Sequence, residues 1–256
     1  MKLASVKGVI TGGVSGLGLA VARHLVSHGA RVTLFDVDAT KSGQAIAELG
    51  AASATFLEVD VTSETAVKGA IEEAAHAMGG LNLAVSCAGV LGAGRVLGRD
   101  GPMPLERFAG TVMVNLVGSF NVAKAAAEQM QGNEPGADGE RGVIINTASI
   151  AAFEGQIGQA AYAASKAGVA GMTLPMAREF SRIGVRVMTI APGVFHTPMV
   201  DIMPEPIQQA LGESIPFPKR LGQADEFASL VAHIIENRYF NGSVIRLDGA
   251  VRLEPK

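Results

Sequence analysis

The sequence has a single cysteine, Cys87, among its 256 residues. One cysteine forms no internal disulfide and supplies no cysteine-based metal cluster. The five histidines show no spacing typical of metal ligands, apart from His24 and His28. Those two lie four residues apart near the end of an expected helix, and a solvated helix end is the simpler interpretation. We therefore expect no metal site.

Charge of one sign and long apolar runs are also scarce. Lysine and arginine number 21 against 24 acidic residues, a net charge of -3 that does not favour binding to nucleic acid or to a membrane surface. No apolar run reaches the roughly 20 residues needed to span a bilayer, and no signal peptide or transit segment precedes the first expected strand. We expect a cytoplasmic protein without nucleic-acid or membrane partners.

What the sequence does contain is a regular alternation of apolar strands and amphipathic helices, with 48% hydrophobic and 18% charged residues. Six consecutive βα units predict one Rossmann-type α/β domain over residues 1–256, a doubly wound parallel sheet of about seven strands with helices on both faces. Strands are expected at 6–10, 30–35, 55–59, 81–86, 143–147, 185–190 and 243–247. Helices are expected at 17–27, 40–49, 63–78, 105–130, 159–181 and 225–236.

A glycine-rich turn joins the first strand to the first helix. Gly12, Gly16 and Gly18 form G-x-x-x-G-x-G. Glycine permits a tight turn and a close approach of the backbone, and the free N–H groups of the helix N-terminus can bind a diphosphate. The Ser15 hydroxyl adds a donor. Because the turn lies between a strand and a helix, it predicts a dinucleotide site.

Acidic residues end the second and third expected strands. A carboxylate at Asp36 would accept hydrogen bonds from the adenosine ribose and repel a 2′-phosphate. No lysine or arginine occupies position 13, 14 or 37 to bind such a phosphate, so the sequence favours NAD(H) over NADP(H). Asp60 lies where a side chain can meet the adenine edge, and it is equally placed to cap the following helix, which begins near Ser63.

Small residues follow two further strands. Cys87, Ala88 and Gly89 would let the cofactor ribose lie against the backbone, and Cys87 reads as a small buried residue rather than a nucleophile. Pro192 and Gly193, with Thr197 shortly after, are placed to hold the nicotinamide carboxamide. The segment 195–218 contains Met199, Ile202, Met203, Ile207 and Leu211, which would form an apolar substrate lid.

Three residues form the candidate catalytic group. Tyr162 and Lys166 are four residues apart and share one helix face. Ser149 follows an apolar strand thirteen residues before Tyr162. A tyrosine beside an ammonium group, with a hydroxyl to hold the substrate oxygen, suits proton transfer to or from an alcohol or carbonyl. Asn115, inside an apolar helix, is either a satisfied buried amide or a link in a proton path.

Together these motifs resemble the short-chain dehydrogenase/reductase family, and they span almost the whole chain in the family's order. The resemblance rests on T-G-G-V-S-G-L-G at 11–18, C-A-G at 87–89, Asn115, Ser149, Tyr162-x-x-x-Lys166 and P-G-x-x-x-T at 192–197. It implies that Tyr162 is the acid/base and that Ser149 orients the substrate oxygen. It also implies that Lys166 lowers the Tyr162 pKa and binds the nicotinamide ribose, and that Asn115 supports a water relay.

Several longer runs are similar to the type II (short-chain) L-3-hydroxyacyl-CoA dehydrogenases, also described as multifunctional 17β-hydroxysteroid dehydrogenases. They include G-V-I-I-N-T-A-S, A-F-E-G-Q-I-G-Q-A-A-Y and P-F-P-K-R-L-G. This resemblance implies an NAD-dependent homotetramer that interconverts 3-hydroxyacyl-CoA and 3-ketoacyl-CoA, with Gln156 and Gln159 near the substrate. His196 and the loop 91–104 depart from the subgroup's pattern. The NAD contacts that the resemblance implies are Ser15, Leu17, Asp36, Asp60, Val61, Cys87, Tyr162, Lys166 and Phe195.

Other functions remain open at this point. One is a different substrate within the family, such as a steroid, another secondary alcohol or a 3-oxoacyl carrier protein. Asp36 argues against the NADPH-dependent carrier-protein reductases. The other is a non-enzymatic role as a scaffold subunit, against which the complete set of Ser149, Tyr162 and Lys166 argues.

Overall fold

The computed structural model describes residues 1–99, 101–201 and 204–255, and its centre is a seven-stranded parallel sheet. The strand order is β3-β2-β1-β4-β7-β8-β9, and every neighbouring pair is parallel. The expected fold class is confirmed. The strands are β1 (Lys7–Thr11), β2 (Arg31–Asp36), β3 (Ala54–Glu58), β4 (Leu83–Ser86), β7 (Gly142–Thr147), β8 (Val185–Pro192) and β9 (Val244–Leu247).

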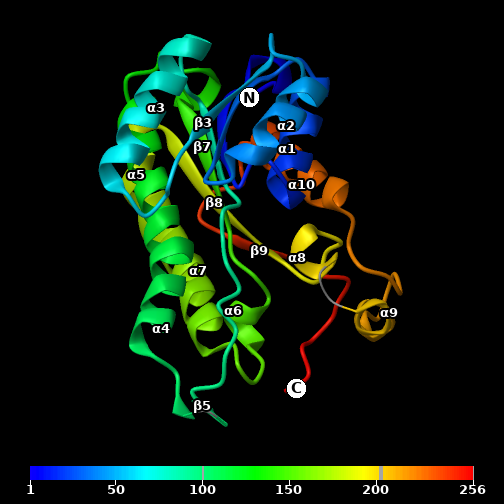
Figure 1. The fold of residues 1–256 in the computed structure, drawn as a ribbon. Helices are drawn as coiled ribbons and strands as arrows, with labels where there is room; N and C mark the ends of the chain where they lie inside the picture. The colour runs from blue at the N-terminus through cyan, green and yellow to red at the C-terminus, as the bar shows by residue number, and fades with distance from the viewer. Residues whose placement is uncertain (100, 202–203, 256) are drawn as a thin grey trace.

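Helices cover both faces of this sheet (Figure 1). One face carries α1 (Gly16–Ser27), α2 (Ser42–Leu49) and α10 (Ala224–Glu236). The other carries α3 (Glu64–Met78), α4 (Leu105–Val112), α5 (Gly118–Met130) and α7 (Ala160–Phe180). Ser63 caps α3, because its hydroxyl accepts a hydrogen bond from the Ala66 N–H. Short 3₁₀ turns lie at Leu3–Ser5, Ala39–Lys41, Ala137–Gly139 and Ser181–Ile183.

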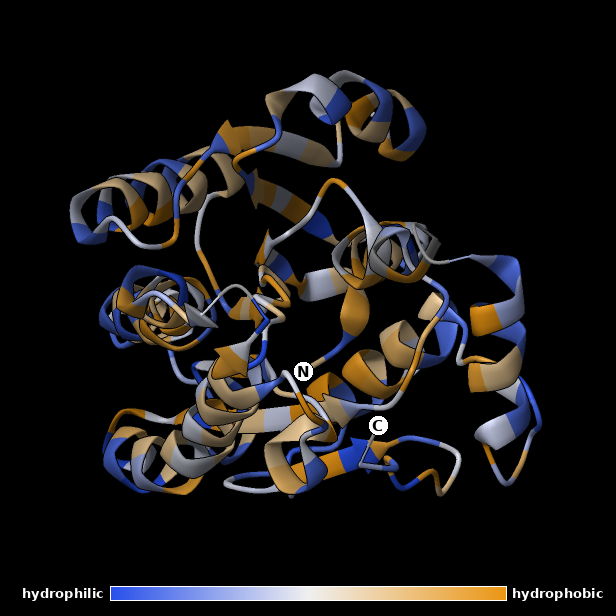
Figure 2. Cartoon of the chain, turned by 60° about the horizontal axis from the view of Figure 1, so that its bottom comes forward, coloured by the Kyte–Doolittle hydropathy of each residue, from blue (hydrophilic) through white to orange (hydrophobic). Residues whose placement is uncertain are grey.

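The core has two layers because the strands are apolar on both sides. Ile145 of β7 packs with α1 and α10, whereas its neighbour Ile144 packs with α3, α5 and α7. Side chains alternate across a strand, so an almost unbroken apolar run fills both layers at once. Figure 2 shows apolar colour concentrated on the strands and on the helix sides that face them.

Four local features were not expected from the sequence. The loop 89–104 contains a small antiparallel hairpin, β5 (Leu97–Gly98) and β6 (Gly101–Pro102). The expected helix at 105–130 is interrupted by a π-helical turn, η3 (Met113–Val117). A one-turn helix, α6 (Ala151–Glu154), precedes α7. The segment after β8 forms α8 (Pro198–Asp201) and α9 (Glu205–Ser214).

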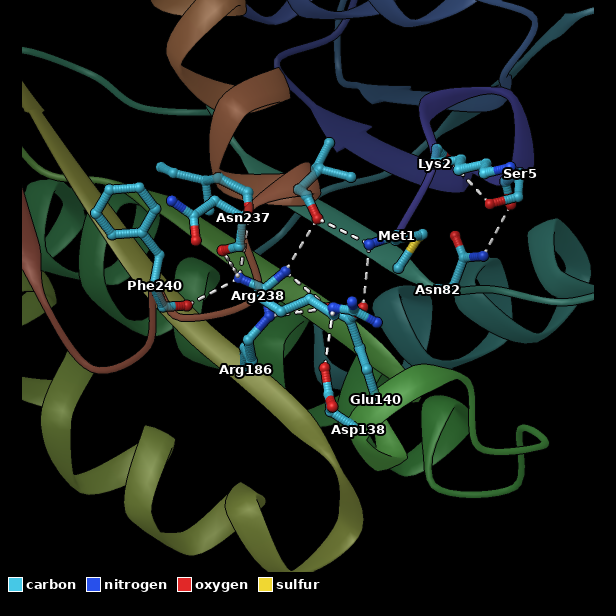
Figure 3. Close-up of polar contacts among 12 residues, drawn as sticks. Met1, Lys2, Ser5, Asn82, Asp138, Glu140, Arg186, Asn237, Arg238 and Phe240 are labelled. Carbon is cyan, nitrogen blue, oxygen red and sulfur yellow. Dashed lines mark hydrogen bonds and ion pairs between the residues drawn. The ribbon is translucent and has the colours of Figure 1, made fainter.

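An ion pair lies at the amino end of the sheet, opposite to the cavity described below (Figure 3). Arg186 of β8 contacts Glu140 at 2.7 Å, and both side chains are almost fully buried. The guanidinium also donates to the backbone carbonyls of Ile234 and Phe240 at 3.0 and 2.8 Å. The pair therefore ties β8 to the end of α10. Among the described residues, no helix is long and apolar enough to cross a bilayer.

Candidate active site

A cavity of about 690 Å³ opens at the carboxyl ends of the strands, beside the point where the strand order reverses between β1 and β4. Open α/β sheets bind ligands at such a point. With the exception of Asn115, the cofactor, catalytic and substrate residues that the sequence suggested, apart from the apolar residues of the lid, all line this cavity. They are Gly12, Ser15, Gly16, Leu17, Gly18, Asp36, Asp60, Val61, Cys87, Ala88, Gly89, Ser149, Gln156, Gln159, Tyr162, Lys166, Pro192, Gly193, Phe195 and Thr197.

The glycine-rich turn forms one end of the cavity. Gly12 and Gly16 have positive φ angles of 63° and 52°, which favour glycine. A methyl group on Gly12 would lie 2.9 Å from the backbone nitrogen of Ala88, and one on Gly18 would collide with the Gly12 carbonyl. Ser15 immediately precedes α1, so the unpaired N–H groups of the first helical turn face the cavity. The turn is a cradle suited to a diphosphate.

Acidic side chains line the same end. The Asp36 carboxylate accepts hydrogen bonds from the backbone N–H groups of Val14 at 3.4 Å and Asp38 at 3.1 Å, which fix it at the end of β2. Lys41 is the nearby cation, and it pairs with Asp38 at 2.9 Å. Asp60 accepts hydrogen bonds from the N–H and hydroxyl of Thr62. Asp60 therefore stabilises the turn before α3 and also faces the cavity.

The candidate catalytic residues meet at the middle of the cavity. Ser149 follows β7 and lines the cavity with Tyr162, and its hydroxyl lies close enough to lower the pKa of the Tyr162 phenol. Lys166, one turn further along α7, donates to the Thr147 carbonyl at 2.8 Å and lies 5.8 Å from the Tyr162 ring centroid. Residues from a strand end and one helix face are thus brought together as the spacing predicted. The arrangement can hold a substrate oxygen beside a phenol.

Burial dominates the ionisation of this group. Desolvation lowers the pKa of the Lys166 ammonium from 10.5 to about 8. Desolvation also raises the pKa of the Tyr162 phenol, and the nearby Ser149 hydroxyl offsets only part of that rise. The sequence suggested the opposite direction for Tyr162, with the Lys166 charge favouring the phenolate. That expectation is wrong for this structure, because the loss of hydration raises the pKa of the phenol more than the Ser149 hydroxyl lowers it.

Asn115 lies behind the cavity wall rather than in it. It occupies the π-helical turn and is fully buried. Its side-chain oxygen accepts from the Val90 N–H at 2.8 Å, and its amide nitrogen donates to the Val90 carbonyl and to the Ser165 hydroxyl. A methyl group on Gly89 would lie 3.1 Å from the Asn115 oxygen and 3.5 Å from the Lys166 nitrogen. Asn115 is therefore a satisfied buried amide beside Lys166.

Cys87 is a partly buried thiol beside this group. It accepts a hydrogen bond from the Thr147 hydroxyl at 3.6 Å. Burial raises the pKa of the Cys87 thiol to about 11. Since the thiolate is the reactive form, we expect Cys87 to be a poor nucleophile at neutral pH.

The cofactor and substrate ends are bridged by the segment after β8. Phe195 is buried and packs edge-on against Phe227, with ring centroids 6.4 Å apart. A methyl group on Gly16 would lie 3.7 Å from Thr197, so this segment approaches the glycine-rich turn. His196, which differs from the sequence pattern of the subgroup, is exposed and is not among the residues that line the cavity.

The substrate end is lined partly by residues that sequence reasoning missed. Gln156 and Gln159 line it as expected and hydrogen bond to each other. Ile207 of the expected lid is half exposed. Ile202, Met203 and the side chain of Met199 lie outside the described part. The unexpected lining residues include Ile150, Ala151, Val194, Val200 and Leu253.

Comparisons with known proteins agree with this site. A sequence model of the short chain dehydrogenase family matches residues 8–207. The chain is 51% identical to human 3-hydroxyacyl-CoA dehydrogenase type-2, and the match covers 98% of each chain. The Drosophila melanogaster protein of the same name is 50% identical over 96% of this chain and 97% of its own.

A solved structure is also similar. The crystal structure of 3-hydroxyacyl-CoA dehydrogenase type-2 from Mycobacterium avium aligns with a TM-score of 0.91 at 45% identity. It covers 97% of this chain and 96% of that one. With the family model matching most of the sequence and relatives matching from end to end, this chain belongs to the short-chain dehydrogenase/reductase family.

Proposed function

We propose that the protein interconverts 3-hydroxyacyl-CoA and 3-ketoacyl-CoA with NAD(H) as the hydride carrier. The observation that carries the reaction type is the Ser149–Tyr162 hydroxyl pair beside buried Lys166, at the centre of a cavity with a diphosphate cradle at one end. The substrate class is supported by the end-to-end similarity to relatives that bear this activity in their names.

The residues present fit a nicotinamide dinucleotide. The N-terminus of α1 and its glycine turn would hold the diphosphate, and Asp36 would accept the adenosine ribose hydroxyls. Asp60 and Val61 would flank the adenine, while Pro192, Gly193 and Thr197 would hold the carboxamide. A 2′-phosphate would meet the Asp36 carboxylate, while Lys41 pairs with Asp38. We therefore propose NAD(H) rather than NADP(H).

The cofactor would supply the hydride, and the protein groups would supply orientation and a proton. Ser149 would donate a hydrogen bond to the substrate carbonyl oxygen and hold it beside Tyr162. The Tyr162 phenol is protonated at neutral pH, since burial raises its pKa further above the ordinary value of 10, and it would transfer its proton to that oxygen as the ketone is reduced. In the oxidative direction the tyrosinate would take the proton back. The Lys166 ammonium, which lies beside Tyr162 and donates to the Thr147 carbonyl, would bind the cofactor ribose.

We further propose a homotetramer, as the resemblance implies. Phe120 of α5 and Leu174 of α7 are large apolar side chains that are almost half exposed on the same layer, and burial between subunits would remove this apolar surface from water. Light scattering after gel filtration would test the assembly, since the proposal requires four times the chain's mass. The expected cytoplasmic location stays a prediction.

The test of function is NADH oxidation by the purified protein with acetoacetyl-CoA, run beside NADPH and beside an acetoacetyl carrier protein. Rapid turnover with NADH and the CoA thioester supports the proposal. Activity confined to NADPH or to the carrier protein would indicate a synthetic reductase. Binding of NADH without turnover of any substrate would favour the scaffold role.

A further inference from the structure

The segment after β9 returns across the substrate end of the cavity. The Gln156 side-chain amide donates to the Glu254 carbonyl at 2.9 Å, and the Ile157 N–H donates to the Pro255 carbonyl at 3.0 Å. Leu253, just before these contacts, lines the cavity. Residues 251–255, here called the C-terminal strap, therefore bring Leu253 into the wall at this end of the cavity.

The wall that the strap completes is aliphatic. Val251 is buried in a small cluster with Ile150, Val200 and Ile215, and Leu253 packs against the same cluster. This cluster joins the residue after Ser149 to helix α8, the end of α9 and the strap. The members of this cluster that line the cavity all have aliphatic side chains, which suit an alkyl chain and not a phosphate or a sugar: Ile150, Val194, Val200, Leu211 and Leu253.

A group of charges fixes the strap in place. Arg246 of β9 pairs with Glu154 of α6, and it donates to Asp248 at 2.7 Å and to the Val251 carbonyl at 3.2 Å. Arg252 contacts the same Asp248 carboxylate at 3.2 Å. Because Arg246 contacts both α6 and the start of the strap, it acts as a positioning residue for Leu253.

We propose that Leu253 is a specificity-determining residue that sets the length of acyl chain the enzyme accepts, with Arg246 holding it in position. This inference rests on the proposed 3-ketoacyl-CoA reductase function. Leu253 lies near the C-terminus, whereas the glycine-rich cofactor turn lies near the N-terminus. Its side chain lines the same cavity wall as Val194, Val200 and Leu211. A shorter side chain at 253 would leave room for further methylene groups.

The test compares kcat/KM with NADH for acetoacetyl-CoA and for 3-ketodecanoyl-CoA. Leu253→Ala should raise the ratio of the long to the short substrate by about tenfold, since one methylene group in an apolar pocket is worth about that much or more. Leu253→Phe should lower the ratio. Leu105→Ala, the same change at an exposed leucine of α4, should leave it unchanged. The shift should appear in KM, and thermal melting should verify that each variant is folded.

A second variant tests the positioning role. Arg246→Met should speed tryptic cleavage after Arg252 and should also move the chain-length ratio, which a purely structural loss of stability would not do. A wild-type enzyme that is active on CoA thioesters, with a ratio that neither Leu253 variant moves more than about twofold, would overturn this inference alone. A folded wild-type enzyme inactive on both thioesters would overturn it together with the proposed function.

Discussion

Replacing Lys166 with methionine should make the folded protein more stable, even though activity is lost. Its pKa falls from 10.5 to about 8 because the ammonium is desolvated. At about 1.4 kcal/mol per pKa unit, the buried Lys166 ammonium lowers the free energy of unfolding by about 3 kcal/mol at neutral pH. Lys166→Met removes that cost but leaves the Thr147 carbonyl without its hydrogen bond, which is worth about 1 kcal/mol. The variant should therefore gain about 2 kcal/mol in free energy of unfolding at pH 7.

The pH dependence of the stability difference between the two proteins tests whether desolvation of Lys166 is its cause. Between about pH 8 and pH 10.5 the unfolded chain holds the Lys166 proton while the folded chain has released it. The unfolded state then binds more protons, so this group makes the wild type more stable as the pH rises. The advantage of Lys166→Met should shrink through this window and disappear near its top. Burial raises the pKa values of Cys87 and Tyr162, and both groups are present in both proteins.

The assay is equilibrium urea unfolding of both proteins at pH 7 and at about pH 10, at one protomer concentration because an oligomer's stability depends on it. Equal m-values would show that the same surface is exposed. A variant less stable than the wild type at pH 7, or an advantage that does not change with pH, would refute the desolvation argument.

Three further predictions follow from the cavity and the sheet. Asp36→Ala should reduce the preference for NADH over NADPH by about tenfold, measured as the ratio of kcat/KM, and an unchanged ratio would remove Asp36 from cofactor selection. Cys87 should resist iodoacetamide at pH 8, because with a pKa of about 11 only about one thiol in a thousand is ionised; rapid labelling seen by mass spectrometry would contradict this. Glu140→Gln should lower the free energy of unfolding by about 3 kcal/mol, since it leaves the buried Arg186 charge without its ion-pair partner; a loss below about 1 kcal/mol in urea would show that the carbonyl contacts suffice.

Much of the site was predictable because parallel strands end at one edge of a sheet. Asp36, Cys87, Ser149 and Pro192 lie at or just beyond the ends of different strands, so their proximity followed once the strand–helix alternation was recognised. The four-residue spacing of Tyr162 and Lys166 placed both on the cavity side of α7. These placements depend on the repeat of the α-helix and on the order of strands and helices, and both can be recognised from short sequence patterns.

The remainder depends on packing that has no local signature. Leu253 lies at the cavity because the next two residues, Glu254 and Pro255, accept hydrogen bonds from residues 98 positions away, and its neighbours in sequence show no motif. The π-helical turn that buries Asn115 lies in a stretch whose apolar periodicity reads as an ordinary helix. The direction of the Tyr162 pKa shift depends on how completely the phenol is desolvated, and only the folded structure shows that.

The central claim is that Tyr162 carries the proton in a reaction whose cofactor and substrate sites are otherwise complete. The direct test is Tyr162→Phe, assayed for turnover of acetoacetyl-CoA with NADH and, in parallel, for NADH binding by fluorescence. We predict a loss of kcat of about 10²-fold or more, with NADH affinity changed little. A variant that binds NADH and still turns over at near the wild-type rate would show that another group moves the proton, and would contradict the account.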